Sequence, residues 1–169
     1  ASRFLLHGWN VCFYDPAPHS EPVLRAVLDK ARHWVPEIYD QLPPEGSLTV
    51  CGSIAEAAVD AEWVQESTPE RLEVKQSVFR DIQAACSEAA IVASSTSGFM
   101  PSELQAGAVR PEQILVAHPY NPVYLLPIVE CVPSARVPGL GLLDIGVRST
   151  VMKKDLKQDR PVAGKLDVE

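Results

Sequence analysis

The sequence predicts an α/β fold in which helices flank a mostly parallel sheet. Short β-rich runs alternate along the chain with longer segments of helical period, as in a sheet with crossover helices. The 169 residues, 46% of them hydrophobic, are enough for one globular domain. Apolar runs such as 89–93 are far shorter than the roughly 20 residues of a membrane span. We therefore expect a soluble, intracellular protein.

Each element has its own local pattern. The β-rich runs predict strands, the last of them an edge strand because it contains Pro127: 10–15, 48–51, 63–66, 91–94, 114–118 and 125–132. Periodic apolar residues predict helices over 1–7, 21–41 and 70–86, and Pro36 is expected to end or kink the second.

Helix starts are marked by capping patterns. Ser53 and Glu56 have the spacing of a capping box, and Thr68-Pro69 predicts a cap followed by proline at the first helical position. Because ligands bind at the carboxyl ends of parallel strands, we expect Asp15, 66–70, 94–98 and 118–121 to line one edge of the sheet.

A dinucleotide-binding domain opens with a strand, a G-x-G-x-x-G loop and a helix, because glycines let the backbone approach the pyrophosphate. Gly8 is the only glycine among the first 45 residues, and residues 1–7 already have a helical pattern. We therefore expect the fold to be truncated at its N-terminus, inside its first crossover helix.

Charge divides the chain near residue 132. Residues 1–132 hold 8 basic and 17 acidic residues, whereas 133–169 hold 7 and 5. The acidic body argues against nucleic-acid and anionic membrane partners. We expect an incomplete nucleotide-binding domain over 1–132 and a tail of unknown structure over 133–169. The four cysteines have no metal-ligand spacing, so we expect no metal, buried thiols and a cytoplasmic location.

Two strand ends carry candidate chemistry. Asp15 is placed where a carboxylate would hold a ribose 2′-hydroxyl, although on its own an aspartate before Pro16 more often begins a turn. His118 ends a strand, and Glu130 follows on the next one. A histidine held by a carboxylate is a general base for a hydroxyl group. A packed loop histidine is the alternative.

Two further groups are ambiguous when read from residue type alone. The hydroxyls of 94–97 could bind a substrate hydroxyl or a nicotinamide, or they could cap a helix. Glu70 and Lys75 stand at the start of a helix, where a solvated charged face is usual.

Three strings change this interpretation: QESTPERLEVK (65–75), SSTSG (94–98) and VAHPYNPVYLLPIVECV (116–132). Together they resemble the 3-hydroxyacyl-CoA dehydrogenase family, and within it the branch that oxidises carnitine. The resemblance covers residues 1–132 and implies a Rossmann-like fold that binds NAD. In the family this domain is completed by a helical domain that carries the homodimer interface, and 133–169 do not resemble it.

The resemblance also implies residue roles. His118 would be the catalytic base, Glu130 its orienting carboxylate and Ser97 the hydroxyl that contacts the substrate oxygen. The cofactor-side residues would be Asp15, Glu70, Lys75, Ser97 and Asn121. Ser97 and Asn121 would also contact substrate, and Tyr120 and Tyr124 are candidates for contact with a trimethylammonium group because cations bind aromatic faces.

The expected reaction is NAD-dependent oxidation of the 3-hydroxyl of L-carnitine to 3-dehydrocarnitine. A 3-hydroxyacyl-CoA dehydrogenase acting on thioesters is the nearest alternative, although an acidic body suits CoA phosphates poorly. A non-catalytic binding module on a nucleotide-binding fold is the alternative from another class. With no glycine loop, the 169-residue chain is expected to bind NAD poorly and to turn over little.

Overall fold

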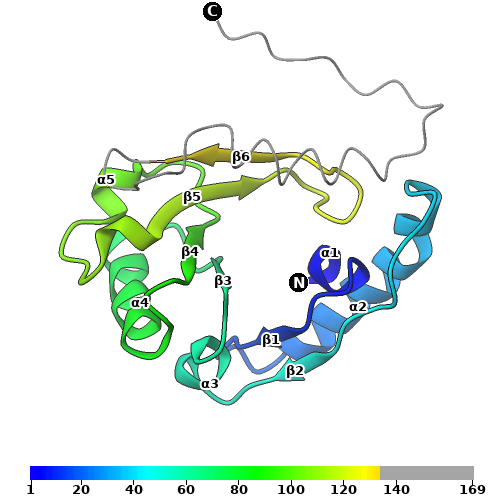
Figure 1. The fold of residues 1–169 in the computed structure, drawn as a ribbon, viewed down its shortest axis with the longest axis horizontal. Coiled ribbons are helices and arrows are strands. Elements are labelled where there is room, and N and C mark those ends of the chain that lie inside the picture. The colour runs from blue at the N-terminus through cyan, green and yellow to red at the C-terminus, as the bar shows by residue number, and fades with distance from the viewer. Residues whose placement is uncertain (134–169) are drawn as a thin grey trace, which may run out of the picture.

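The structure, a computed structural model, describes residues 1–133 (Figure 1). Its helices are α1 (Ser2–Leu6), α2 (Ser20–Trp34), α3 (Ile54–Ala58), α4 (Leu72–Ala85) and α5 (Pro101–Leu104), with 3-10 turns η1 (Val35–Glu37) and η2 (Pro111–Gln113). Its strands are β1 (Val11–Phe13), β2 (Leu48–Val50), β3 (Trp63–Glu66), β4 (Ile91–Ser94), β5 (Ile114–Pro119) and β6 (Val129–Val132).

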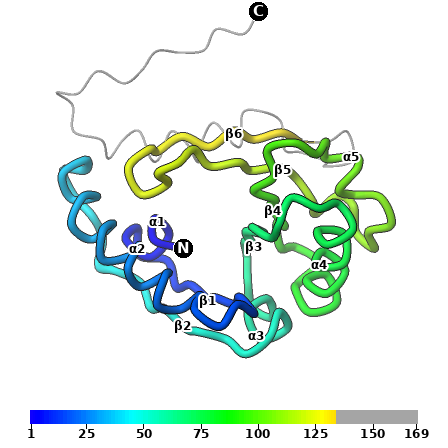
Figure 2. Tube along the Cα trace, turned by 180° about the vertical axis from the view of Figure 1, so that it is seen from behind, coloured from blue at the N-terminus to red at the C-terminus, as the bar shows by residue number. Residues whose placement is uncertain are grey.

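The strands form two sheets. β1 and β2 pair in parallel, and a second sheet has the order β3-β4-β5-β6. Within the second sheet β3, β4 and β5 are parallel, and β6 runs antiparallel to β5. The predicted α/β fold with a mostly parallel sheet and flanking helices is confirmed. Figure 2 shows β1, β2, α1 and α2 on one side of the molecule and β3 to β5 with α4 and α5 on the other, while β6 runs across the top of the view.

β1 and β3 each keep one open edge among the described strands. The Val11 amide donates to Ser47 O at 2.8 Å and Phe13 O accepts from Cys51 at 2.8 Å, so the backbone of Cys12 faces away from β2. At the two ends of β3, Glu62 O accepts from the Ile91 amide and Glu66 O accepts from the Ser95 amide. The backbone groups of residues 63 and 65 therefore face away from β4. Both edges can accept another strand.

Each of these two parts of the molecule has an apolar cluster that stabilises it. Helices α3, α4 and α5 pack on one face of β4 and β5 through fully buried residues that include Phe79, Val92, Leu104 and Ile114. On the other side, Leu6 of α1 packs against Ala31, Val35 and Tyr39. The long chain between β5 and β6 reaches this second cluster through Tyr124.

The element predictions differ from the structure at their ends. Pro36 lies in η1 and the α-helix ends at Trp34, as expected for proline. The edge strand begins at Val129, beyond Pro127. Ser53 caps α3 as predicted, because the Glu56 amide donates to Ser53 Oγ at 3.1 Å, but the Glu56 carboxylate accepts from the amide of Gly52 and not from that of Ser53, so only half of the capping box forms.

The prediction of a helix start at Thr68-Pro69 was wrong. The α-helix begins at Leu72 with Arg71 as its N-cap, and both the amide and the hydroxyl of Thr68 donate to Glu66. The expectation of buried thiols was also wrong for Cys12, which is exposed, and only partly right for Cys51 and Cys131, which are half-buried.

No helix among residues 1–133 is long and apolar enough to cross a membrane. The same residues contain no group of three or more His, Cys, Asp or Glu side chains that could hold a metal ion. Apart from residue 133, the predicted tail lies outside the described residues.

Candidate functional site

The carboxyl ends of β3, β4 and β5 meet at one edge of the sheet. Glu66 is opposite Ser94, which is opposite Val116. The Gln65 side chain ties the three strand ends together, because its Nε2 donates to Ser95 Oγ at 2.8 Å and to Ala117 O at 3.0 Å. The structure therefore brings together three of the four predicted segments, and the fourth, at Asp15, follows β1 in the other sheet.

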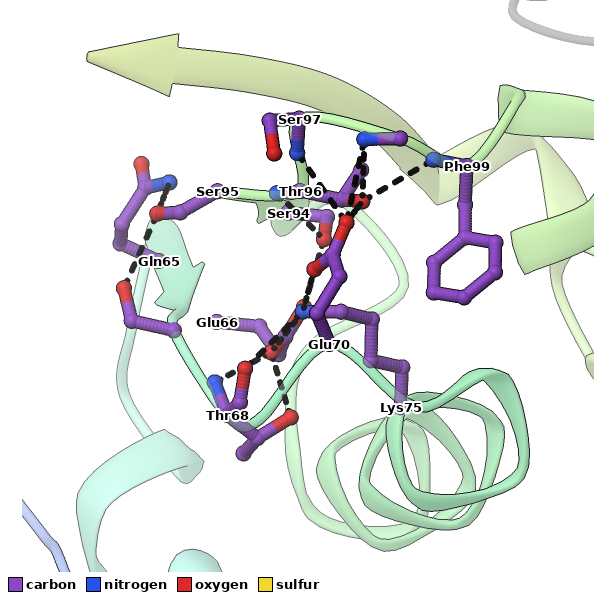
Figure 3. Close-up of polar contacts among 12 residues, drawn as sticks. Gln65, Glu66, Thr68, Glu70, Lys75, Ser94, Ser95, Thr96, Ser97 and Phe99 are labelled. Atoms are coloured by element: carbon purple, nitrogen blue, oxygen red, sulfur yellow. Dashed lines mark hydrogen bonds and ion pairs between the residues drawn. The ribbon is translucent and has the colours of Figure 1, made fainter. Parts of the chain in front are cut away.

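A buried carboxylate lies at the centre of this edge (Figure 3). Glu66 is 3% exposed. Its Oε1 accepts from Thr68 N at 2.5 Å and from Thr68 Oγ1 at 2.6 Å, and its Oε2 accepts from Ser94 Oγ at 2.6 Å. Lys75 Nζ donates to both oxygens, at 3.0 and 3.3 Å. Charge and hydrogen-bonding capacity are thus both satisfied, as a buried carboxylate requires.

Lys75, predicted to be a cofactor-side residue, is 1% exposed and lies on the first turns of α4. Besides Glu66, its Nζ contacts Thr68 O at 3.1 Å and Glu70 Oε2 at 3.3 Å. An ammonium group has three donors. Contacts with these three neighbouring protein residues are therefore enough to occupy the ammonium group of Lys75.

Glu70 connects this cluster to the turn after β4. Its Oε1 accepts from Thr96 Oγ1, from Ser97 N at 3.2 Å and from Gly98 N at 3.0 Å. Burial alone would raise the pKa of Glu70, but the hydrogen bonds from Thr96 and Gly98, with Lys75 nearby, lower it below its usual value. Glu70 therefore stays ionised and holds the turn. Ser97 is exposed on that turn.

His118 and Glu130 are directly opposite each other on the antiparallel strands β5 and β6. His118 Nδ1 lies 3.5 Å from Glu130 Oε2, and the two side chains are 28% and 55% exposed. Burial, with the nearby Glu130 charge, raises the pKa of Cys131 above its usual value, so that thiol stays protonated. Because Nδ1 of His118 faces Glu130, Nε2 is the ring nitrogen that can face a substrate.

The chain after His118 presents the remaining predicted residues. Tyr120 is 45% exposed, and its ring centroid lies 5.8 Å from that of His118. Asn121 is exposed and precedes a cis peptide bond to Pro122. Tyr124 is half-buried against the α1–α2 cluster, and its carbonyl accepts from Arg3 Nη1 at 3.1 Å. The structure thus places Tyr120, and not Tyr124, beside the histidine.

Asp15 is exposed and begins a turn, since its Oδ1 accepts from Ala17 N at 2.8 Å. It also lines an open hollow of about 490 Å³ whose wall is mostly apolar, with Phe13, Val23 and Leu24 among its residues. An exposed carboxylate beside an apolar hollow fits the adenosine half of NAD, because the ribose hydroxyls can donate to the carboxylate while the base contacts the apolar wall.

Sequence reasoning placed Glu66 and Thr68 at this edge, but it did not predict the contacts that Glu66, Thr68 and Gln65 make there. Glu66 could have been singled out because it is a carboxylate at the end of a predicted strand. The burial of Glu66 could not be predicted from one sequence, because it depends on contacts with Ser94 and Lys75, which lie on two other elements.

Comparison with known proteins identifies the family. Residues 1–139 match the NAD-binding domain of 3-hydroxyacyl-CoA dehydrogenase. An L-carnitine dehydrogenase/betainyl-CoA thioesterase of Ruegeria pomeroyi is 55% identical over 135 residues, which are 79% of this chain and 28% of that protein. An L-carnitine dehydrogenase of Pseudomonas aeruginosa is 44% identical over 138 residues, 80% of this chain and 42% of that protein. The chain thus spans less than half the length of these two curated relatives.

Solved structures agree with the fold. The NAD+-dependent dismutase 5-formyl-3-hydroxy-2-methylpyridine 4-carboxylic acid 5-dehydrogenase has a TM-score of 0.78 and 30% identity, covering 88% of this chain and 50% of that one. The 3-hydroxybutyryl-CoA dehydrogenase of Escherichia coli, 21% identical with a TM-score of 0.65, covers 86% of this chain and 32% of that one and supports the fold alone. The chain belongs to the 3-hydroxyacyl-CoA dehydrogenase family, as part of its NAD-binding domain.

Proposed function

We propose that the natural polypeptide carrying this chain oxidises the 3-hydroxyl of L-carnitine to 3-dehydrocarnitine with NAD. The observation that carries the proposal is the His118–Glu130 pair, in which a half-buried imidazole is held by a carboxylate on the neighbouring strand. The similarity to proteins named L-carnitine dehydrogenase supports the choice of substrate.

His118 has the role of general base. Glu130 lies against Nδ1, so the Nδ1–H tautomer is favoured and Nε2 accepts the proton of the substrate hydroxyl. As that proton leaves, the carbon–oxygen bond becomes a carbonyl and the carbon-bound hydrogen departs with its electron pair. NAD, when bound, supplies the acceptor for this hydride. The imidazolium is stabilised by the Glu130 carboxylate until it releases the proton to solvent.

The turn after β4 has the role of holding the substrate oxygen. Ser97 is exposed there, while its backbone amide is fixed by Glu70. A hydroxyl group positioned on an ordered turn can donate to an oxygen that is becoming a carbonyl. Asn121, exposed on the chain that follows His118, is the second polar group that we assign to the substrate and nicotinamide.

The charge of the site suits a cationic substrate. Tyr120 offers an exposed aromatic face next to His118, and Glu130 keeps more than half of its side chain exposed. Aromatic faces and carboxylates both attract a trimethylammonium group. Residues 1–132 carry an excess of nine acidic over basic residues, which repels the phosphates of a CoA thioester.

The substrate is tested with the natural polypeptide and NAD by following NADH formation. We expect kcat/KM for L-carnitine to exceed that for 3-hydroxybutyryl-CoA by at least about a hundredfold, a ratio that differing polar contacts can supply. Equal or better turnover of the thioester would contradict the carnitine assignment and favour a 3-hydroxyacyl-CoA dehydrogenase. NAD binding without turnover of either substrate would favour the non-catalytic module.

Replacing Tyr120 by Ala should raise KM for L-carnitine roughly two- to fivefold, because Tyr120 is 45% exposed and a cation–π contact at an exposed site contributes about 0.5–1 kcal/mol. kcat should change little, since the contact is made equally in the ground and transition states. Tyr120→Phe, which keeps the aromatic face, and 3-hydroxybutyrate, which lacks the ammonium group, are the controls. An unchanged KM for carnitine in Tyr120→Ala would remove Tyr120 from the cation site.

A further inference from the structure

We propose that Glu66 and Lys75 are positioning residues, which hold Glu70 in place so that it orders the turn carrying Ser97. The resemblance assigns Lys75 to the cofactor side and gives Glu66 no role. The contacts in Figure 3 instead form one continuous chain, from the end of β3 through α4 to the turn after β4.

The first step is the burial of Glu66. A carboxylate that is 3% exposed costs several kcal/mol unless a cation and hydrogen-bond donors compensate for the lost water. Lys75 supplies the charge to both oxygens, at 3.0 and 3.3 Å, and Ser94 supplies a hydroxyl at 2.6 Å. Glu66 therefore fixes the position of the Lys75 ammonium group with respect to β3 and β4.

The second step runs from Lys75 to Glu70. Lys75 is 1% exposed and its Nζ also contacts Thr68 O, so the ammonium group cannot turn outward to a ligand without breaking the buried pair. The contact that leads from it toward the surface is the one to Glu70 Oε2, at 3.3 Å. Lys75 therefore acts on the site through Glu70.

The third step uses the other oxygen of Glu70. Oε1 accepts from the Thr96 hydroxyl and from the amides of Ser97 and Gly98, while Oε2 faces Lys75. One carboxylate thus joins the buried cation to three donors of the turn. Holding Oε2 fixes the direction of Oε1, and this sets the conformation in which Ser97 is presented.

The importance of that conformation for catalysis rests on the proposed function, in which Ser97 holds the substrate oxygen. The ordering of the turn does not depend on that function. It can be measured without substrate or cofactor, so a failure of the ordering can be distinguished from a failure of the reaction.

The experiment compares amide hydrogen exchange in the natural polypeptide and in the double variant Glu66→Gln/Lys75→Met. The double variant removes both buried charges together, which avoids leaving one of them uncompensated. We expect the amides of Ser97 and Gly98 to exchange about tenfold faster, the loss of one net hydrogen bond, while the amide of Val92 in β4 is unchanged. The double variant Arg71→Met/Glu73→Gln removes an exposed pair beside the same helix, with both side chains more than 60% exposed, and should leave all three amides unchanged.

Glu70→Gln keeps the buried pair intact and makes the test independent of how well the first variant folds. It should raise exchange at Ser97 and Gly98 to a similar degree. With carnitine as substrate, both variants should lower kcat about tenfold with little change in KM, because Ser97 is needed most in the transition state. Parental exchange at Ser97 and Gly98 in either variant would overturn the proposal. Faster exchange with parental kcat would retain the ordering and remove its catalytic role.

Discussion

Replacement of His118 by Gln should lower kcat for L-carnitine roughly 10³-fold in the natural polypeptide, because a positioned general base contributes 10²–10⁴-fold. Gln can occupy the same space and donate to Glu130, but it cannot accept the hydroxyl proton at Nε2. KM should change much less, since proton transfer occurs only in the transition state. Steady-state rates of NADH formation give both values.

Two further variants make this result specific. His33→Gln changes an exposed histidine on α2 and should keep the parental kcat. Glu130→Gln should also lower kcat, because an amide can donate to Nδ1 and so favour the wrong tautomer of His118. If His118→Gln turned over carnitine at a rate near that of His33→Gln, the His–Glu mechanism would be wrong.

The arrangement of His118 and Glu130 shows what strand pattern alone can predict. Both residues lie on predicted strands, 114–118 and 125–132. If these two consecutive strands pair, a residue of one can lie opposite a residue of the other. The structure has this pairing, with His118 opposite Glu130. The 3.5 Å contact could not be predicted from one sequence, because it also depends on the antiparallel register.

Lys75 and Glu66 show where the same reasoning fails. A lysine near the start of an amphipathic helix is most often solvated, and the pattern gave no reason to bury it. Its burial follows from tertiary contacts, since Glu66, Thr68 and Glu70 surround its ammonium group. The misplaced helix start at Thr68 has the same origin, because the amide and the hydroxyl of Thr68 both donate to the buried carboxylate of Glu66, whose burial depends on tertiary contacts.

The open edges of β1 and β3 support the second prediction with a large expected effect, which concerns NAD affinity. The backbone of Cys12 on β1 and the backbone groups at 63 and 65 on β3 have no strand partner among the described residues. The hollow beside Asp15 offers the adenosine half of NAD a place, but Gly8 and Gly46 are the only glycines of residues 1–50 and neither forms a G-x-G-x-x-G loop. Nothing in that part of the chain therefore offers the glycine loop that lets backbone amides reach a pyrophosphate.

Extending Ala1 with a designed apolar strand and a G-x-G-x-x-G loop should lower the Kd for NAD at least about a hundredfold relative to the 169-residue chain, which corresponds to about 2.7 kcal/mol. The added strand would pair with the open edges of β1 and β3, and the loop would direct amides at the start of α1 toward the pyrophosphate. Calorimetric titration with NAD measures both affinities. The control extension carries prolines at two successive positions at the centre of its strand, where they remove ladder hydrogen bonds toward both neighbouring strands. Because the control keeps the glycine loop but pairs much less well, equal affinity for both extensions would show that the open edges do not receive a strand. Tight binding by the 169-residue chain itself would show that it needs no added strand.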